Sequence, residues 1–260
     1  MIRNLLIISG AGLVLAMVGI GGSMAIGGAD LARHTYTWAL DDNDNGVLFQ
    51  RTTAAEVKDT MISRQIAWDN REALAIRVPG DVLYVQTSEN PGITISGPSQ
   101  MVERVSYDNG RILISDYERD GKAYVSWGPG GIRGWNTSEG LKIVIRAPSV
   151  KAFDLQGQAD VKVQGYAQPS LDLTLTGNSD IEVFGRAERV SVDASGNSSA
   201  YLDELISGDA AINISGNADA TTAANGRVTI NGSGTSEVRL TRRAAELQQT
   251  LSGEAEVTQD

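Results

Sequence analysis

Thr176-Gly177-Asn178-Ser179-Asp180-Ile181-Glu182-Val183 is the clearest copy of a phrase that occurs six times between Leu141 and Val257. Its glycine has counterparts 18 to 20 residues apart, which are Gly157, Gly177, Gly196, Gly216, Gly234 and Gly253. A period near 20 residues is typical of a solenoid, in which each repeat buries its apolar side chains only by stacking on its neighbours. This repeat therefore decides the fold class.

Apolar residues alternate with polar ones on both sides of each glycine. In the second copy, Leu171, Leu173 and Leu175 precede the glycine, and Ile181 and Val183 follow it. A period of two indicates strands with one buried face. We predict an all-β parallel β-helix with coils of about 19 residues, each supplying two or more short strands. The alternative is an antiparallel sandwich of hairpins, because Gly-Asn also begins tight turns.

The repeated glycine is predicted at a corner between two strands, where it permits a positive φ. The residue two positions after it is always small, as close packing of successive corners requires: Ala159, Ser179, Ser198, Ala218, Ser236 and Ala255. The six glycines are thus predicted to have structural roles.

An acidic position follows each corner. In successive coils it holds Asp160, Asp180, Ser199, Asp219, Glu237 and Glu256. Carboxylates stacked at the strand spacing repel one another by roughly 1 kcal/mol even in water. Three forms of relief are possible: splaying into solvent, hydrogen bonds from neighbouring asparagines, or a bound calcium ion held by Asp160, Asp180 and Asp219. The spacing differs from the nonapeptide of calcium-binding β-helices, so solvated acids are the preferred interpretation.

Composition excludes several functions. The 260 residues carry a net charge of −10 and no basic cluster, so we expect no nucleic-acid partner. There is no cysteine and a single histidine, His34, so nitrogen and sulfur ligands for zinc are missing and a Ser-His-Asp site would depend on His34 alone. We expect no cofactor apart from the calcium considered above, and no catalytic residues.

The amino-terminal segment indicates export. Residues 4–29 are uncharged and longer than the ~20 residues that span a bilayer. They are either a signal anchor in the inner membrane or a signal peptide cleaved after the small residues of Ser23-Met24-Ala25. Both predictions place residues 30–260 outside the cytoplasm, in the bacterial cell envelope.

The remaining chain is predicted as a neck over residues 30–70 and a β-helix domain over 71–258. In the neck, Asp41 to Gly46 resemble the start of a calcium loop, but Thr52 replaces the bidentate glutamate, so an acidic turn is preferred. Residues 54–66 are expected to form a short helix. The β-helix domain carries a Gly- and Trp-rich insertion at 118–140, where Trp127 and Trp135 are the candidate ligand-binding residues, unless both rings fold back as a lid.

Residues 70–257 resemble the bacterial GIN-domain family, also called the putative autotransporter adhesin head domain. The resemblance rests on the strand and Pro-Gly of Ile76 to Asp81, on the run from Leu141 to Pro148, and on the phrase from Asp154 to Val161 with its repeats. Gln158 and Asn178 depart from the small polar residue that the family usually has after the glycine. The resemblance implies a right-handed β-helix at the cell envelope with no established enzymatic activity and no catalytic residues.

We therefore expect a non-enzymatic envelope protein that binds or adheres through its β-helix, with a glycan or an envelope protein as partner. One alternative is an enzyme acting on acidic polysaccharide, with Asp154 and Asp172 on one exterior face and Lys151 and Lys162 nearby. Another is an assembly protein that oligomerises through the helix ends or the membrane anchor.

Overall fold

The computed structural model describes residues 36–43, 46–52, 61–115, 123–128, 131–136 and 140–260, with side chains for 61–115 and 140–260. The chain divides into two compact units, residues 1–58 with 119–137 and residues 59–118 with 138–260. No helix within the described ranges is long and apolar enough to cross a membrane. The predicted anchor or signal peptide, residues 4–29, lies outside the described residues.

The first unit contains a four-stranded antiparallel sheet in the order β10-β9-β1-β2. Its strands are β1 (Tyr36–Asn43), β2 (Gly46–Thr52), β9 (Ala123–Gly128) and β10 (Gly131–Asn136). The calcium-loop candidate falls at the β1–β2 connection, where Asn43 pairs with Gly46, so strands flank it instead of the helices of a calcium-binding hand.

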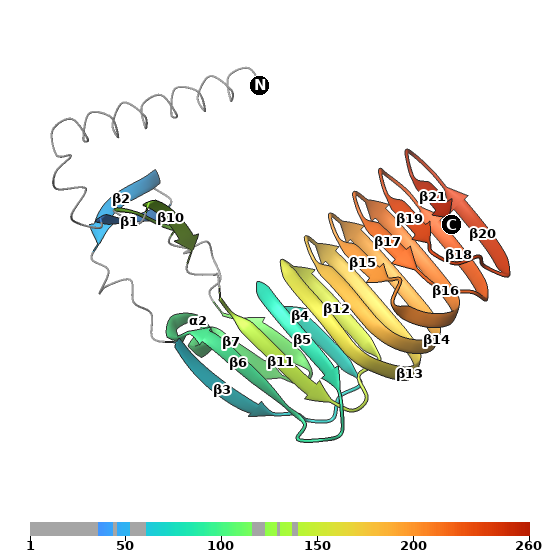
Figure 1. The fold of residues 1–260 in the computed structure, drawn as a ribbon, viewed down its shortest axis with the longest axis horizontal. Coiled ribbons are helices and arrows are strands. Elements are labelled where there is room, and N and C mark those ends of the chain that lie inside the picture. Colours follow the sequence, from blue (N-terminus) through green and yellow to red (C-terminus); the bar gives the residue numbers. More distant parts are fainter. Residues whose placement is uncertain (1–35, 44–45, 53–60, 116–122, 129–130, 137–139) are drawn as a thin grey trace, which may run out of the picture. The chain divides into compact units, whose positions relative to one another are not determined.

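The second unit is a β-solenoid whose coils turn at the repeated glycines (Figure 1). The strands that precede the corners form what we call the pre-corner sheet: β4 (Ala73–Arg77), β12 (Ala152–Gly157), the end of β13 (Ala159–Gly177), the end of β14 (Asp180–Gly196), β16 (Leu205–Gly216), β18 (Arg227–Gly232) and β20 (Glu246–Leu251). The strands after the corners form the post-corner sheet: β5 (Gly80–Gln86), the starts of β13 and β14, β15 (Ser199–Leu202), β17 (Asp219–Thr222), β19 (Glu237–Leu240) and β21 (Glu256–Gln259).

Successive coils pair in parallel with the repeated phrases in register. Gly157 pairs with Gly177, Gly177 with Gly196, and Gly196 with Gly216. The predicted β-solenoid is therefore confirmed, and the hairpin sandwich is wrong for these coils. The right-handed sense of the winding stays a prediction.

The core is the column of inward-facing residues that alternation predicted. Leu155, Leu175, Ala194 and Ile214 follow one another on adjacent strands and are at most 4 % exposed. On the post-corner side, Val161, Ile181, Ala200, Ala220 and Val238 form an equivalent row, at most 2 % exposed. Each coil alone would expose its row, so stacking supplies the burial that stabilises the strands.

The amino-terminal end of the column is closed by antiparallel strands, which we call the cap. The post-corner sheet continues from β5 to β11 (Lys142–Ala147), then antiparallel to β6 (Gly92–Pro98) and β3 (Met61–Ala67). The helix α2 (Ser99–Arg104) and the hairpin of β7 (Val105–Asp108) and β8 (Arg111–Ile114) complete the cap, and β8 pairs in parallel with β4.

One expectation fails in the cap, and one segment there departs from what its sequence pattern suggests. The helix predicted over 54–66 is wrong at residues 61–66, because these lie in β3. Residues 93–98 echo the repeat but do not form a coil corner, since β6 runs antiparallel to both β11 and β3. Alternating apolar residues specify which face of a strand is buried, and they leave the direction of its neighbour open.

Candidate functional site

The acidic position after each corner forms one row along the exterior of the post-corner sheet. Asp160 pairs with Asp180, Asp180 with Ser199, and the row continues through Asp219 and Glu237 to Glu256. This predicted alignment is confirmed. The row also extends into the cap, where Asp160 pairs with Asp81 and Asp81 with Lys142.

Like charges in this row disturb one another most at Asp160. Its partial burial raises the pKa of its carboxyl, and the carboxylates of Asp81, Asp180 and Glu182 raise it further, against the opposing charge of Lys162. Lys162 itself is bound to Glu182 at 2.8 Å. At Asp160 the effects of burial and of neighbouring carboxylates therefore outweigh the positive charge of Lys162.

The three residues suggested as calcium ligands do not converge. Ser199 separates Asp180 from Asp219 in the row. Within the described residues, no group of three Asp, Glu, His or Cys side chains is arranged to hold a metal ion. The corner asparagines bond to each other instead, with Asn197 Nδ2 donating to Asn178 Oδ1 at 3.1 Å. Side-chain positions thus give the calcium hypothesis no support.

The exterior of the pre-corner sheet has a different chemistry. One row contains Thr174, Asp193, Asn213, Asn231 and Thr250 on adjacent strands. The next row contains Thr176, Ser195 and Ser215, and Ser233 and Ser252 follow the paired residues of the next two coils. We call these ten residues the amide–hydroxyl face; Asp193 is the only charged residue among them, and Asp154 adjoins the face beside Thr174.

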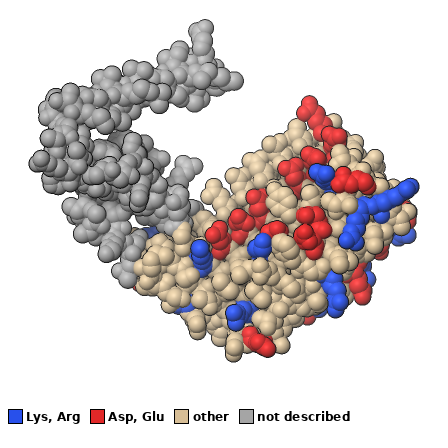
Figure 2. All heavy atoms as spheres, in the orientation of Figure 1, with Lys and Arg blue, Asp and Glu red and all other residues tan. Residues whose placement is uncertain are grey.

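A hydrogen-bonded chain orders the amide–hydroxyl face. Asn231 Nδ2 donates to Asn213 Oδ1 at 2.9 Å, and Asn213 Nδ2 donates to Asp193 Oδ1 at 2.7 Å. A shallow hollow of about 340 Å³ lies over these rows. Figure 2 shows Asp and Glu side chains interspersed with Lys and Arg over the visible surface of the coils.

The arrangement suggested for polysaccharide cleavage is not assembled. Asp154 pairs with Thr174 and with Ala75, whereas Asp172 pairs with Ala152 and Ser191, so the two carboxylates are not opposite each other. The two nearby lysines are already bound to other acids, since Lys151 contacts Glu72 at 2.8 Å and Lys162 contacts Glu182. Neither lysine is therefore free to set the protonation states of Asp154 and Asp172 apart as an acid and a base.

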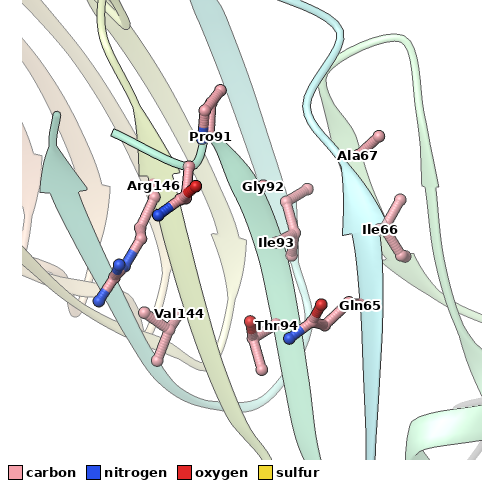
Figure 3. A pocket seen from close by; sticks show the side chains of 10 residues that line it. Gln65, Ile66, Ala67, Pro91, Gly92, Ile93, Thr94, Val144 and Arg146 are labelled. Carbon is pink, nitrogen blue, oxygen red and sulfur yellow. The ribbon is translucent and has the colours of Figure 1, made fainter. Parts of the chain in front are cut away.

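The cap contains a hollow of about 700 Å³, which sequence reasoning missed. It lies on the exterior of β3, β6 and β11, and Figure 3 shows Gln65 and Thr94 close together across from Val144 and Arg146. The other lining residues are Ile66, Ala67, Asn90, Pro91, Gly92 and Ile93. Only the antiparallel register places Gly92 opposite Arg146, so no local signal in the sequence indicated this hollow.

Trp127 and Trp135 lie in the other unit. Trp127 is in β9, paired with Tyr36 and Ile132, and Trp135 is in β10, paired with Tyr124. The Gly- and Trp-rich insertion thus contributes strands to the antiparallel sheet, while the side chains of both tryptophans lie outside the described residues. Their binding role stays a prediction.

A solved structure shares this architecture at low sequence identity. The solved structure of a "putative adhesin" from Bacteroides fragilis shares the fold at 13% identity with a TM-score of 0.57, over 78% of this chain and 98% of that one. A "putative adhesin" from Parabacteroides merdae aligns at 12% identity and a TM-score of 0.43, over 77% and 96% of the two chains. A protein from Parabacteroides distasonis described as a "putative lipid binding protein" aligns at 12% identity and a TM-score of 0.42, over the same shares.

No curated protein matches the chain significantly. The family model "Putative auto-transporter adhesin, head GIN domain" matches residues 74–244, which span the solenoid from β4 almost to β20. The predicted resemblance is therefore confirmed: the chain belongs to the GIN-domain family.

Proposed function

We propose that this protein is a non-enzymatic binding or adhesion module of the bacterial cell envelope, and that the amide–hydroxyl face is its contact surface. The observation that carries the proposal is the repetition of uncharged hydrogen-bonding side chains, coil after coil, on one exterior face. A ligand with its own repeating polar groups, such as a glycan, would meet equivalent contacts on each coil, and weak contacts in series give avidity.

Several O–H and N–H donors on the amide–hydroxyl face make no hydrogen bond to a described residue. The hydroxyls of Ser195, Ser215 and Ser233 donate no hydrogen bond to any described residue, and each Asn of the amide chain keeps a second N–H. Serine and threonine lose little side-chain entropy when a ligand immobilises them, and the amide chain is already ordered. These properties favour binding of an external polar surface.

The envelope location rests on the uncharged residues 4–29, acting as a single-pass inner-membrane anchor or as a signal peptide for export to the periplasm. An envelope protein as partner and oligomerisation through the helix ends or the anchor belong to the same proposal. The family name supports an adhesive role over an enzymatic one. Binding of a glycan by Trp127 and Trp135, which belong to the other unit, is part of the same proposal.

The proposal is tested by retention of isolated envelope polysaccharide on the immobilised protein. Thr174→Lys and Ser215→Lys place long charged side chains on the amide–hydroxyl face and are expected to reduce retention at least about tenfold. Tyr201→Lys is the matched control, because Tyr201 is 44% exposed on the post-corner sheet. Equal retention by all variants would contradict this surface.

A parallel assay separates binding from catalysis. Incubation with the same polysaccharide is expected to release no reducing ends. Release that disappears in Asp154→Ala or Asp172→Ala would replace the binding function with the enzymatic alternative.

A further inference from the structure

The cap hollow owes its shape to residue size in one antiparallel row. Ala67, Gly92 and Arg146 pair across β3, β6 and β11. Gly92 has no side chain to fill the space beside Arg146, and a Cβ atom there would lie 3.2 Å from the carbonyl oxygen of Ile66. The neighbouring row of Gln65, Thr94 and Val144 forms the opposite wall.

Charge distinguishes this hollow from the others on the solenoid. The hollow of about 630 Å³ around Arg186 is also lined by Glu188. The hollow of about 330 Å³ around Arg189 and Arg227 is lined by two carboxylates, Asp172 and Asp209. The cap hollow is lined by Arg146 and by no carboxylate, and none of the ion pairs among the described residues engages Arg146.

The cap is also the part of the solenoid where an anion meets the least repulsion. Residues 59–118 and 138–151 of the second unit contain eight Lys and Arg against ten Asp and Glu, a net charge of −2. Residues 152–260 contain seven against 16, a net charge of −9. Screening limits the reach of exposed charges to roughly 10 Å at 0.1 M salt, so the local balance around Arg146 matters more than the total.

The neutral walls suit a ligand that carries hydroxyl groups as well as charge. The side chains of Gln65, Asn90 and Thr94 donate no hydrogen bond to any described residue, so their amides and hydroxyl are available. Pro91 and Val144 offer apolar surface beside them. The volume lies within the range of about 300–1,000 Å³ typical of small-ligand sites.

We propose that the cap hollow binds a carboxylate-bearing sugar, a uronic acid residue, with the guanidinium of Arg146 paired to its carboxylate. A guanidinium presents a planar pair of N–H donors that matches a carboxylate in two parallel hydrogen bonds. The single positive charge of Arg146 balances the single negative charge of a uronate. The amides of Gln65 and Asn90 and the hydroxyl of Thr94 form hydrogen bonds with the hydroxyl groups of the sugar. The site is separate from the amide–hydroxyl face and does not depend on the function proposed for that face.

The test is calorimetric titration of the full chain, in mild detergent, with trigalacturonate and with its methyl ester. We expect the acid to bind, the ester to bind at least about tenfold more weakly, and affinity for the acid to fall as salt is raised. Arg146→Gln is expected to weaken binding of the acid at least about tenfold. Arg186→Gln, which removes an arginine from a hollow that has its own carboxylate, is expected to leave it unchanged.

A second variant tests the hollow by filling it, without changing any charge. Ala67→Phe fills the hollow from the exposed side of β3 and is expected to abolish binding while the thermal midpoint stays near that of the parent protein. No binding by the parent protein, equal binding of acid and ester, or full binding by Arg146→Gln would overturn the proposal. Inorganic phosphate that competes as well as trigalacturonate would overturn the assignment to a uronate. None of these results bears on retention by the amide–hydroxyl face.

Discussion

The backbone N–H of Asn178 donates a hydrogen bond of 2.8 Å to the carbonyl oxygen of Gly157, one coil earlier. Asn197 makes the same bond to Gly177, and Asn217 to Gly196, each at 2.8 Å. Each corner glycine has a positive φ, and from Gly177 onward a Cβ atom would meet the backbone of the preceding corner glycine, which explains why these positions exclude a side chain.

The corner glycines provide a matched pair of substitutions. Gly196 has φ +89°, and a Cβ atom there would lie 2.6 Å from the Gly177 carbonyl oxygen, whereas at Gly157, with φ +102°, it would meet nothing within 4 Å. Gly157→Ala is expected to cost only backbone strain, about 1–2 kcal/mol. Gly196→Ala adds a steric clash and is expected to cost about 3 kcal/mol or more. Thermal unfolding followed by circular dichroism measures both; equal effects would contradict the close stacking.

Ser199 interrupts the acidic row between Asp180 and Asp219. Substitutions at this position therefore measure the repulsion between carboxylates on adjacent coils. Ser199→Asp is expected to lower stability by roughly 0.2–1 kcal/mol for each like-charged neighbour, and Ser199→Lys to raise it by a similar amount. Urea unfolding at low salt measures the difference, which should narrow at 1 M salt because the charges are screened. Identical stability of the two variants at low salt would show that the acids splay apart.

Asp160 makes the stability of the fold depend on pH. Its pKa is raised in the folded protein, chiefly by burial and then by Asp81 and Asp180, so the folded state holds this proton more tightly than the unfolded state. The carboxyl therefore destabilises the fold increasingly as pH rises through its pKa, and the effect disappears below the ordinary value of 3.8. Asp160→Asn is expected to raise the thermal midpoint at pH 7 and to have no effect at pH 3.

The matched control for this pH dependence is Asp193→Asn. The Asp193 carboxylate accepts the Asn213 amide at 2.7 Å, so neutralising it should bring no gain in the thermal midpoint at pH 7. A gain as large as that of Asp160→Asn would point to the net charge of the protein instead of the row as the cause.

Tyr84 fastens the cap to the first coils. Its hydroxyl donates to the Ala147 carbonyl at 2.8 Å and accepts the Val150 N–H at 3.4 Å, and its ring packs edge-on to Phe153 at 5.2 Å. Tyr84→Phe keeps the ring and leaves two buried backbone groups without this partner. We expect a loss of about 1–3 kcal/mol in the free energy of unfolding, measured in urea.

The same hydroxyl predicts alkaline sensitivity. Burial raises the pKa of Tyr84 from 10.0 to about 12, so its contribution to stability is complete below pH 10 and is lost as pH rises toward 12. Between these values the stability of Tyr84→Phe is expected to fall less steeply with pH than that of the parent protein. Parallel pH profiles of the two proteins would contradict this role.

The sequence by itself determined the coils. The glycine period set which residues stack, and alternation set which residues are buried, because every coil obeys the same local rule and its partner is always the next coil. For this reason the acidic row from Asp160 to Glu256 was predicted residue by residue. The sequence also carried the family resemblance, through the same repeated phrase.

Only the tertiary structure decided the cap and what it positions. Strand β12 stacks on β4, with Phe153 paired to Leu74, although 78 residues lie between these two positions in the chain. Strand β6 runs antiparallel where its pattern resembled a coil, and this reversal places Gly92 beside Arg146. Alternation specifies a buried face but neither the partner nor its direction, so pairings between distant segments follow from how the whole chain covers the end of its core.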